Sequence, residues 1–280
     1  MCMEKNLYQE FDNLIHIEKR ERDSHKGYYG KVLIVAGCEG MAGAALMCGK
    51  AALRGGAGLV RFSVPKEIYP VLQLGVPEAT CLPREFEEAV NIHEYEAIAL
   101  GPGLGLLKSN IPTIKKILNE YRGKLVIDAD GLNCIMKYSL YGNLSATEAK
   151  VILTPHQGEA KRLLEVEQIE DDRQSALDIS EAFNATVVMK GANTLVVEKD
   201  RGYRNKTGNP GMATGGSGDV LTGTVAAFLA QGFDSFRSSV LGTYVHGRAG
   251  DLAAEKYGEV GMTAMNIIEK LPLAINEIYG

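Results

Sequence analysis

The sequence predicts an α/β fold, with a mostly parallel central sheet, helices on both of its faces and a few antiparallel strands. Three observations support this prediction. Apolar runs of strand length alternate with helical stretches through the first two thirds, short strand-like runs then follow in quick succession, and the last part is helical. Alternating strands and helices are typical of parallel sheets that are covered on both faces.

The parallel sheet is expected to contain five apolar runs. The first, residues 31–36, is rich in β-branched residues and ends at Gly37, which suits a buried parallel strand. The other expected strands are residues 59–64, 97–100, 124–127 and 151–153. Between the first two, residues 43–53 combine small residues with Leu and Met at helical spacing, which predicts a helix packed tightly against the sheet.

The pattern changes at Thr186. Three strand-like runs, residues 186–191, 193–200 and 202–207, are separated only by turn residues, which favours hairpins over strand–helix–strand units. From Ser217 to the end the sequence is helical in pattern. Since no repeat or linker divides the chain, we expect one domain over residues 25–280, preceded by an N-terminal extension, residues 1–24.

The composition excludes several classes of protein. The formal net charge of −5 and the lack of a dense basic run argue against nucleic-acid binding, which depends on neutralising phosphates. Five cysteines without a C-x-x-C pair predict reduced thiols and no structural metal site. A polar N-terminus and the absence of a long apolar run predict a cytoplasmic protein without a membrane partner.

Glycine and polar residues gather where the predicted strands end. The stretches are GPGLG at 101–105, DADGLN at 128–133, TPHQGE at 154–159 and KGANT at 190–194. Ligands of open parallel sheets bind outside the carboxyl ends of the strands. These stretches are therefore expected to meet at one ligand-binding edge.

The glycine-rich stretch at residues 209–223 carries the strongest chemical signal. Ser217 is expected to cap a helix that begins near Asp219. The N–H groups of Gly216, Ser217 and Gly218 would then form an anion hole at the positive end of that helix. A carboxylate beside such a site, here Asp219, suits a base that accepts a proton from an attacking hydroxyl. The alternative is a flexible loop with an ordinary helix cap.

Several segments in order resemble the ADP-dependent NAD(P)H-hydrate dehydratases of the ribokinase-like superfamily. The resemblance covers roughly residues 25–270, and its segments are HKGYYGKVLIVAG, GMAGAALM, GPGLG, VIDADGLN, LTPHQGE, MKGANTLV and NPGMATGGSGDVLTG. It implies a ribokinase-like fold and ADP-dependent repair of the S-epimer of hydrated NADH or NADPH. In that reaction the ring hydroxyl is phosphorylated by ADP, and elimination of phosphate restores the dihydronicotinamide and leaves AMP.

The resemblance also implies roles for single residues. Asp219 would be the catalytic base and would also contact the substrate. The implied contacts along the AMP portion of the nucleotide are Lys190, Gly191, Ala192, Asn193 and Thr194, with Gly218 at the phosphate. The implied contacts with the hydrated cofactor are Ala44, Gly103, His156 and Asp219.

The residues themselves leave alternatives open. KGANT is also a good hairpin turn, and Ala44 and Gly103 also suit close packing of a helix against a sheet. His156 could contact the substrate or cap a loop, whereas His246, in the middle of a helical stretch, is expected to be a structural histidine.

Cofactors and partners are implied in the same way. Asp128 and Asp130 could support a hydrated Mg²⁺ on the donor phosphates, or could serve as turn residues, and no direct metal ligand is indicated. The resemblance implies a homotetramer and a separate epimerase, since residues 1–24 are too few for an epimerase domain. The competing functions are a kinase of a vitamin precursor, such as hydroxymethylpyrimidine or hydroxyethylthiazole, and a nucleotide-binding regulator without catalysis.

Overall fold

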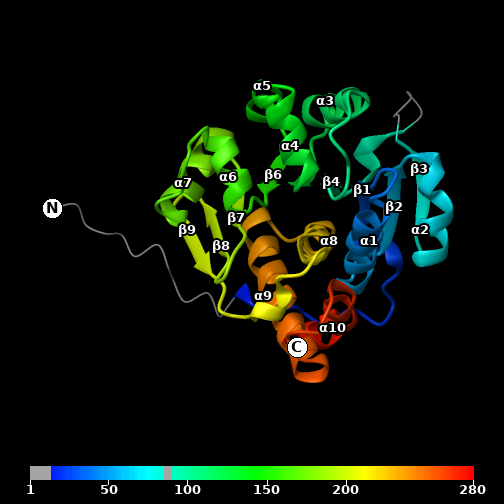
Figure 1. Cartoon of the computed structure of the whole chain (residues 1–280). Coiled ribbons are helices and arrows are strands. Elements are labelled where there is room, and N and C mark those ends of the chain that lie inside the picture. Colours follow the sequence, from blue (N-terminus) through cyan, green and yellow to red (C-terminus); the bar gives the residue numbers. More distant parts are fainter. Residues whose placement is uncertain (1–13, 85–89) are drawn as a thin grey trace.

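The computed structural model describes residues 14–84 and 90–280, so the first part of the predicted N-terminal extension, residues 1–13, lies outside the described chain (Figure 1). The described residues form one nine-stranded sheet in the order β3-β2-β1-β4-β5-β6-β7-β8-β9. The strands are β1 Lys31–Val35, β2 Leu59–Val64, β3 Thr80–Pro83, β4 Ala97–Leu100, β5 Lys124–Ile127, β6 Lys150–Leu153, β7 Thr186–Met189, β8 Leu195–Glu198 and β9 Arg201–Arg204.

The pairing confirms a mostly parallel sheet. The strands from β3 to β7 pair in parallel, whereas β7, β8 and β9 pair antiparallel. The prediction of hairpins from Thr186 onward is confirmed by the antiparallel pairs β7–β8 and β8–β9, and β7 also pairs in parallel with β6 across two intervening helices. The edge strand β3 was not predicted, because its four residues, all at least partly exposed, carry no long apolar run.

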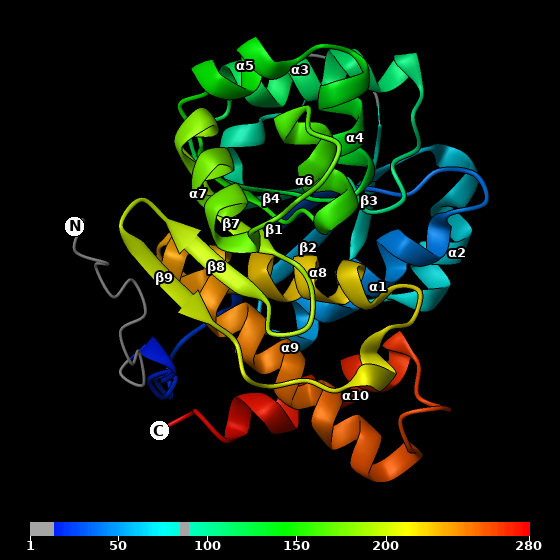
Figure 2. The same ribbon diagram turned by 60° about the vertical axis from the view of Figure 1, so that its left-hand side comes forward.

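Helices cover both faces of the sheet. They are α1 Ala42–Arg54, α2 Tyr69–Gly75, α3 Ile111–Glu120, α4 Asp130–Lys137, α5 Tyr141–Ala146, α6 Gln157–Leu164, α7 Asp172–Phe183, α8 Ser217–Ala230, α9 Ser235–Tyr257 and α10 Ala264–Asn276. Short 3-10 turns occupy Lys26–Tyr29, Lys66–Ile68, Ile92–Glu94, Lys108–Asn110 and Pro210–Met212. Helices α3 to α7 lie over one face, while α1, α8 and α9 lie over the other with α10 outermost (Figure 2).

The side chains of the strands alternate between two apolar clusters, one on each face of the sheet. In β1, Leu33 and Val35 pack toward α3 to α7, whereas Val32 and Ile34 pack toward α1 and α8. Every second side chain of a strand points to the same face, so a strand that is buried on both faces has an unbroken apolar run. This is why the first predicted strand matches the structure closely.

Helix α8 is buried on nearly all sides. Its residues from Val220 to Ala230 are all buried, as expected of a helix that is apolar around its whole circumference. Gly223 allows α1 to approach closely, since a Cβ there would lie 2.1 Å from the carbonyl oxygen of Cys48. The predicted close packing of the small-residue helix α1 is confirmed, and it fixes the N-terminus of α8 at the carboxyl edge of the sheet.

None of the helices within residues 14–84 and 90–280 is both long enough and apolar enough to cross a bilayer.

Candidate functional site

The glycine-rich stretch leads into α8 through a left-handed glycine. Gly216 occupies the N-cap position with φ of +91°, and Ser217 is the first residue of the helix rather than its cap. The helix therefore begins about two residues earlier than predicted, because the glycine makes the turn that a capping side chain would otherwise stabilise. The N–H of Ser217 donates to the carbonyl of Thr214 at 3.3 Å, whereas Gly218 and Asp219 lie in the first turn, where amides lack acceptors inside the helix.

Asp219 lies in this first turn, and its pKa is raised to about 7. The main cause is burial, which disfavours the charged carboxylate, and the negative charge of Asp128 adds to it. The positive charge of Lys190 opposes both effects. A carboxylate with a pKa near neutrality can both accept and release a proton under physiological conditions, as a general base must.

A buried ion-pair network lies beside the N-terminus of α8. The Lys190 ammonium, just after β7, is 2.5 Å from Asp128 Oδ1 and 3.6 Å from Glu159 Oε2. The Thr222 hydroxyl donates to the other Asp128 oxygen at 2.7 Å. Although burial alone would lower the pKa of Lys190, the two carboxylates raise it, so the ammonium stays charged. A Cβ on Gly218 would lie 3.6 Å from Lys190 Nζ, which places this positive charge at the helix N-terminus.

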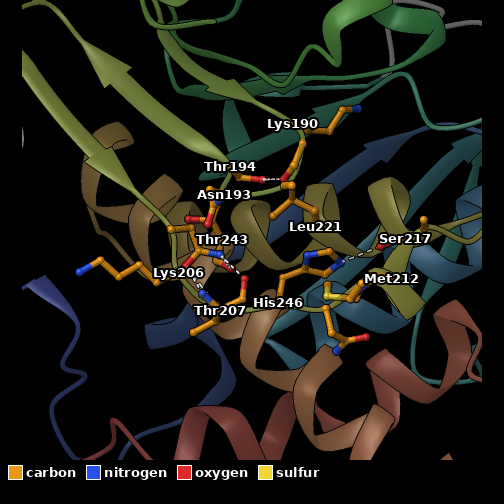
Figure 3. Close-up of a pocket in the computed structure, with 18 of the residues that line it drawn as sticks. Lys190, Asn193, Thr194, Lys206, Thr207, Met212, Ser217, Leu221, Thr243 and His246 are labelled. Atoms are coloured by element: carbon orange, nitrogen blue, oxygen red, sulfur yellow. Dashed lines mark hydrogen bonds between the residues drawn. The ribbon is translucent and has the colours of Figure 1, made fainter. Parts of the chain in front are cut away.

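A cavity of about 630 Å³ opens between the β7–β8 turn, the N-terminus of α8 and one side of α9 (Figure 3). The six residues predicted to contact the nucleotide all line it: Lys190, Gly191, Ala192, Asn193, Thr194 and Gly218. The turn alternative is also correct, because residues 190–194 join the antiparallel strands β7 and β8. The structure thus brings the predicted nucleotide residues together, while their contact with ADP stays a prediction.

The cavity has further walls that the sequence analysis did not assign to the site. These residues come from the segment after β9 and from α9, and they are Asn205, Lys206, Thr207, Gly208, Asn209, Pro210, Met212, Ala213, Thr243, His246 and Gly247, with Leu221 from α8. No local motif marks the part contributed by α9. These residues become neighbours only because α9 packs beside α8 and β8.

His246 is buried, as predicted for a structural histidine, but it also forms part of the cavity wall (Figure 3). Its Nε2 lies 3.3 Å from the Ser217 hydroxyl oxygen. Burial lowers the pKa of His246 to about 4, so the ring is neutral at physiological pH. A neutral imidazole can share a hydrogen bond with Ser217 without placing a second positive charge beside Lys190.

Ala44 and Gly103, two of the predicted substrate contacts, lie against each other outside this cavity. Gly103 has φ of +58°, and a Cβ there would lie 2.8 Å from the Ala44 Cβ and 2.9 Å from the Met41 carbonyl oxygen. Close packing, the alternative reading of these residues, is therefore correct. Met47, in the turn of α1 that follows Ala44, lies against Gly216, since a Cβ on that glycine would be 2.4 Å from the methionine sulfur. The first turns of α1 thus join the Gly103 loop to the start of α8.

His156 caps helix α6. Its Nδ1 accepts from the N–H of Gly158 at 2.9 Å and of Glu159 at 3.3 Å, and Glu159 accepts in return from the His156 N–H at 2.9 Å. The capping alternative is therefore correct. In the neutral ring, accepting at Nδ1 leaves the proton on Nε2. His156 Nε2 lies 3.5 Å from Glu159 Oε1, and the side chain is about half exposed. An isolated β-bridge between His156 and Lys190 places the histidine at the same edge of the sheet as the ion-pair network.

Asp128 and Asp130, the residues that could support a hydrated Mg²⁺, both have hydrogen-bond partners within the protein. Both Asp128 oxygens have partners, and Asp130 Oδ2 accepts from the Gly105 N–H at 2.9 Å. Among residues 14–84 and 90–280 there is no group of three or more His, Cys, Asp or Glu side chains that could hold a metal ion. For Asp130 the bond to Gly105 supports the alternative role in turn structure.

The fold identifies the superfamily to which the protein belongs. A ribokinase-like superfamily protein from Enterococcus faecalis superposes with a TM-score of 0.84 at 29% identity, over 97% of this chain and 96% of that one. The mostly parallel sheet with its late antiparallel strands is thus a ribokinase-like fold.

Within that class, residues 32–273 match the NAD(P)H-hydrate dehydratase family, and the chain belongs to it. The ADP-dependent (S)-NAD(P)H-hydrate dehydratase of Neisseria meningitidis is 38% identical over 250 residues, which are 87% of this chain and 84% of that protein. The structure of an ADP/ATP-dependent NAD(P)H-hydrate dehydratase from Bacillus subtilis, crystallised with ATP and Mg²⁺, gives a TM-score of 0.82 at 28% identity and 95% coverage of each chain.

The chain spans about half the length of the first curated relatives that it matches, bifunctional NAD(P)H-hydrate repair enzymes of which it covers 52–55%. These findings confirm the predicted family and do not favour a vitamin-precursor kinase.

Proposed function

We propose that the protein dehydrates the S-epimer of hydrated NADH or NADPH back to NADH or NADPH, with ADP as phosphoryl donor and AMP and phosphate as products. The observation that carries the proposal is Asp219, a carboxylate with a pKa of about 7 in the first turn of α8. Its neighbours Ser217, Gly218 and Leu221 line a cavity large enough for a nucleotide.

The first step is transfer of the terminal phosphoryl group of ADP. Asp219 accepts the proton of the ring hydroxyl, and the hydroxyl oxygen forms a bond to the β-phosphorus while the bond from that phosphorus to the AMP oxygen breaks. Negative charge gathers on the transferred group and on the departing AMP. The free N–H groups in the first turn of α8 and the charged Lys190, which lies beside Gly218, would stabilise this charge with little reorganisation.

The second step needs less from the protein. The lone pair of the ring nitrogen expels phosphate by breaking the bond between ring carbon and oxygen, and loss of a proton from the adjacent ring carbon restores the dihydronicotinamide. Holding the ring close to Asp219 is then the main requirement, and positioning of this kind can supply much of a rate enhancement. We propose that Gly103 and Ala44 let the flat ring approach the main chain and that the Nε2–H of His156 donates to the substrate.

We also propose that the cavity binds ADP. The AMP portion would lie along residues 190–194, with its phosphate near Gly218, since all of these residues line the cavity. Of the predicted anion hole of Gly216, Ser217 and Gly218, Ser217 and Gly218 line the cavity, and the Ser217 N–H donates to the Thr214 carbonyl. A Mg²⁺ would arrive bound to the nucleotide phosphates and waters rather than in a protein cage. Cytoplasmic location, a homotetramer and a separate epimerase partner stay predictions.

The reaction can be tested with purified protein and a mixture of hydrated NADH and NADPH. ADP and ATP are supplied separately with Mg²⁺, and recovery of dihydronicotinamide absorbance is followed together with release of AMP, ADP and phosphate. Recovery with ADP, matched by equal AMP and phosphate, is expected. Absence of recovery with either nucleotide, in a preparation that binds ADP, would contradict the proposed function.

A further inference from the structure

A buried arginine lies at the carboxyl edge of the sheet, away from the ion-pair network of Lys190. Arg84, which directly follows β3, is only 4% exposed. Its Nε donates to the Ser63 carbonyl in β2 at 3.2 Å, and its Nη2 donates to the Ala36 carbonyl just after β1 at 2.6 Å and to the Gly37 carbonyl. One guanidinium therefore joins the ends of two neighbouring strands.

The same guanidinium reaches the loop after β4 through a second buried side chain. Arg84 Nη1 donates to Asn110 Oδ1 at 3.0 Å, and Asn110 is 2% exposed. The Asn110 amide nitrogen in turn donates to the carbonyls of Leu104 at 3.2 Å and Gly105 at 2.8 Å. These two carbonyls belong to the GPGLG loop, residues 101–105, which contains Gly103.

Other hydrogen bonds also hold the GPGLG loop: the Gly101 N–H donates to the Val35 carbonyl at 3.0 Å, and the Gly105 N–H donates to Asp130 Oδ2 at 2.9 Å. The Pro102 carbonyl accepts from the Gly37 N–H at 2.7 Å, next to the Gly37 carbonyl that Arg84 binds. Hydrogen bonds from a charged donor are stronger than neutral ones, and a buried carbonyl that loses its donor is costly. The Arg84–Asn110 pair therefore holds the carbonyls of Leu104 and Gly105, directly after Gly103, while Arg84 also binds the Gly37 carbonyl beside the Pro102 end of the loop.

We propose that Arg84 and Asn110 are positioning residues that hold the GPGLG loop in the conformation that accepts the hydrated nicotinamide ring. The identity of that ligand rests on the proposed function, whereas the hold on the loop rests on the hydrogen bonds alone. Neither side chain touches the substrate. They act through the backbone of Leu104 and Gly105, one and two residues after Gly103.

Two substitutions test the hydrogen bonds of Arg84 and those of Asn110 separately. Arg84→Lys keeps the buried positive charge but cannot make all four bonds. Asn110→Asp keeps an acceptor for Arg84 but replaces the amide donor with a carboxylate oxygen, which repels the carbonyls of Leu104 and Gly105. Arg122→Met serves as the control, because Arg122 forms a half-exposed ion pair with Glu148 at a distant surface.

Steady-state kinetics and nucleotide binding test the proposal. Both site variants are expected to raise KM for the hydrated cofactor by about tenfold or more, since displacement of a positioning element by about 1 Å can cost up to 100-fold. The Kd for ADP, measured by calorimetry, should change by less than about twofold, because neither Arg84, Asn110 nor any residue of the GPGLG loop lines the nucleotide cavity. The Arg122→Met variant should match the unmodified protein in both.

A purely structural role gives a different result. If the variants only unfold more easily, a smaller active fraction lowers kcat and leaves KM for the hydrated cofactor unchanged, and that outcome would overturn the proposal. A parallel rise of KM for the hydrated cofactor and Kd for ADP would overturn it as well.

Hydrogen exchange separates this inference from the proposed function. Amides of the GPGLG loop should exchange faster in both site variants, with residues 190–208 unchanged. If the unmodified protein has no dehydratase activity, the proposed function fails. The exchange result then decides by itself whether Arg84 and Asn110 hold the loop, and unchanged exchange there would refute it.

Discussion

Replacing Asp219 by asparagine should remove turnover and, above neutral pH, stabilise the folded protein. The carboxyl of Asp219 has a pKa of about 7 in the folded state, against an ordinary value of 3.8. At pH values between these two pKa values, the Asp219 carboxyl is protonated in the folded protein and ionised in the unfolded chain. The free energy of unfolding therefore falls as the pH rises from about 4 to about 7, and the full cost applies above that range.

The size of the effect follows from this difference. A pKa raised by about three units corresponds to about 4 kcal/mol at 1.36 kcal/mol per unit. The positive end of α8 favours the carboxylate by roughly 1 kcal/mol or less. Because asparagine stays neutral, Asp219→Asn should raise the free energy of unfolding by about 3 kcal/mol at about pH 8 and leave it nearly unchanged at about pH 4.

Urea unfolding of both proteins at these two pH values measures the difference, since every other titrating group is common to both. Turnover should fall by about 100-fold or more, because general-base catalysis contributes about that much, while ADP binding is retained. The apparent pKa of about 7 in the acid limb of kcat/KM should also disappear from any residual activity. Equal loss of turnover and ADP binding, or no gain in stability at high pH, would refute this account of Asp219.

Three further changes test the rest of the site. Gly103→Ala places a Cβ 2.8 Å from that of Ala44, so KM for the hydrated cofactor should rise in steady-state assays, and an unchanged KM would count against substrate binding there. Lys190→Met leaves the Asp128 carboxylate buried without its ammonium partner; we expect a loss of about 3–5 kcal/mol in urea unfolding and weaker ADP binding by calorimetry. His246→Gln should leave the pH profile between about pH 5 and 9 unchanged, because the histidine, with its pKa lowered to about 4, is neutral throughout that range.

The parallel strands could be predicted because burial on both faces leaves a direct mark on the sequence. Residues 32–35 are apolar without a break, and together with Lys31 they form β1 as expected. The short edge strand β3 lacks that mark, since an exposed edge needs no continuous apolar run. The parallel pairing of β7 with β6 was missed for another reason: a strand buried on both sides looks the same whether its neighbour runs parallel or antiparallel.

The candidate site was predictable where it depends on local backbone chemistry. A glycine-rich turn before a helix, followed by a carboxylate in the first turn, is visible in the sequence around Gly216 and Asp219. The contributions of His246 and Arg84 were not visible in this way. Each reaches the site from a segment distant in the chain, and its role depends on hydrogen bonds that exist only once the strands and helices have packed.

The most direct test of the proposed chemistry follows the ring oxygen. Hydrated NADH is prepared in water enriched in a heavy oxygen isotope, so that its ring hydroxyl carries the label, and it is then incubated with the protein and ADP in ordinary water. Phosphorylation of the hydroxyl followed by elimination predicts that the labelled oxygen leaves in the released phosphate, one labelled oxygen for each dihydronicotinamide recovered. Label found in water, with unlabelled phosphate, would contradict phosphoryl transfer to the hydroxyl.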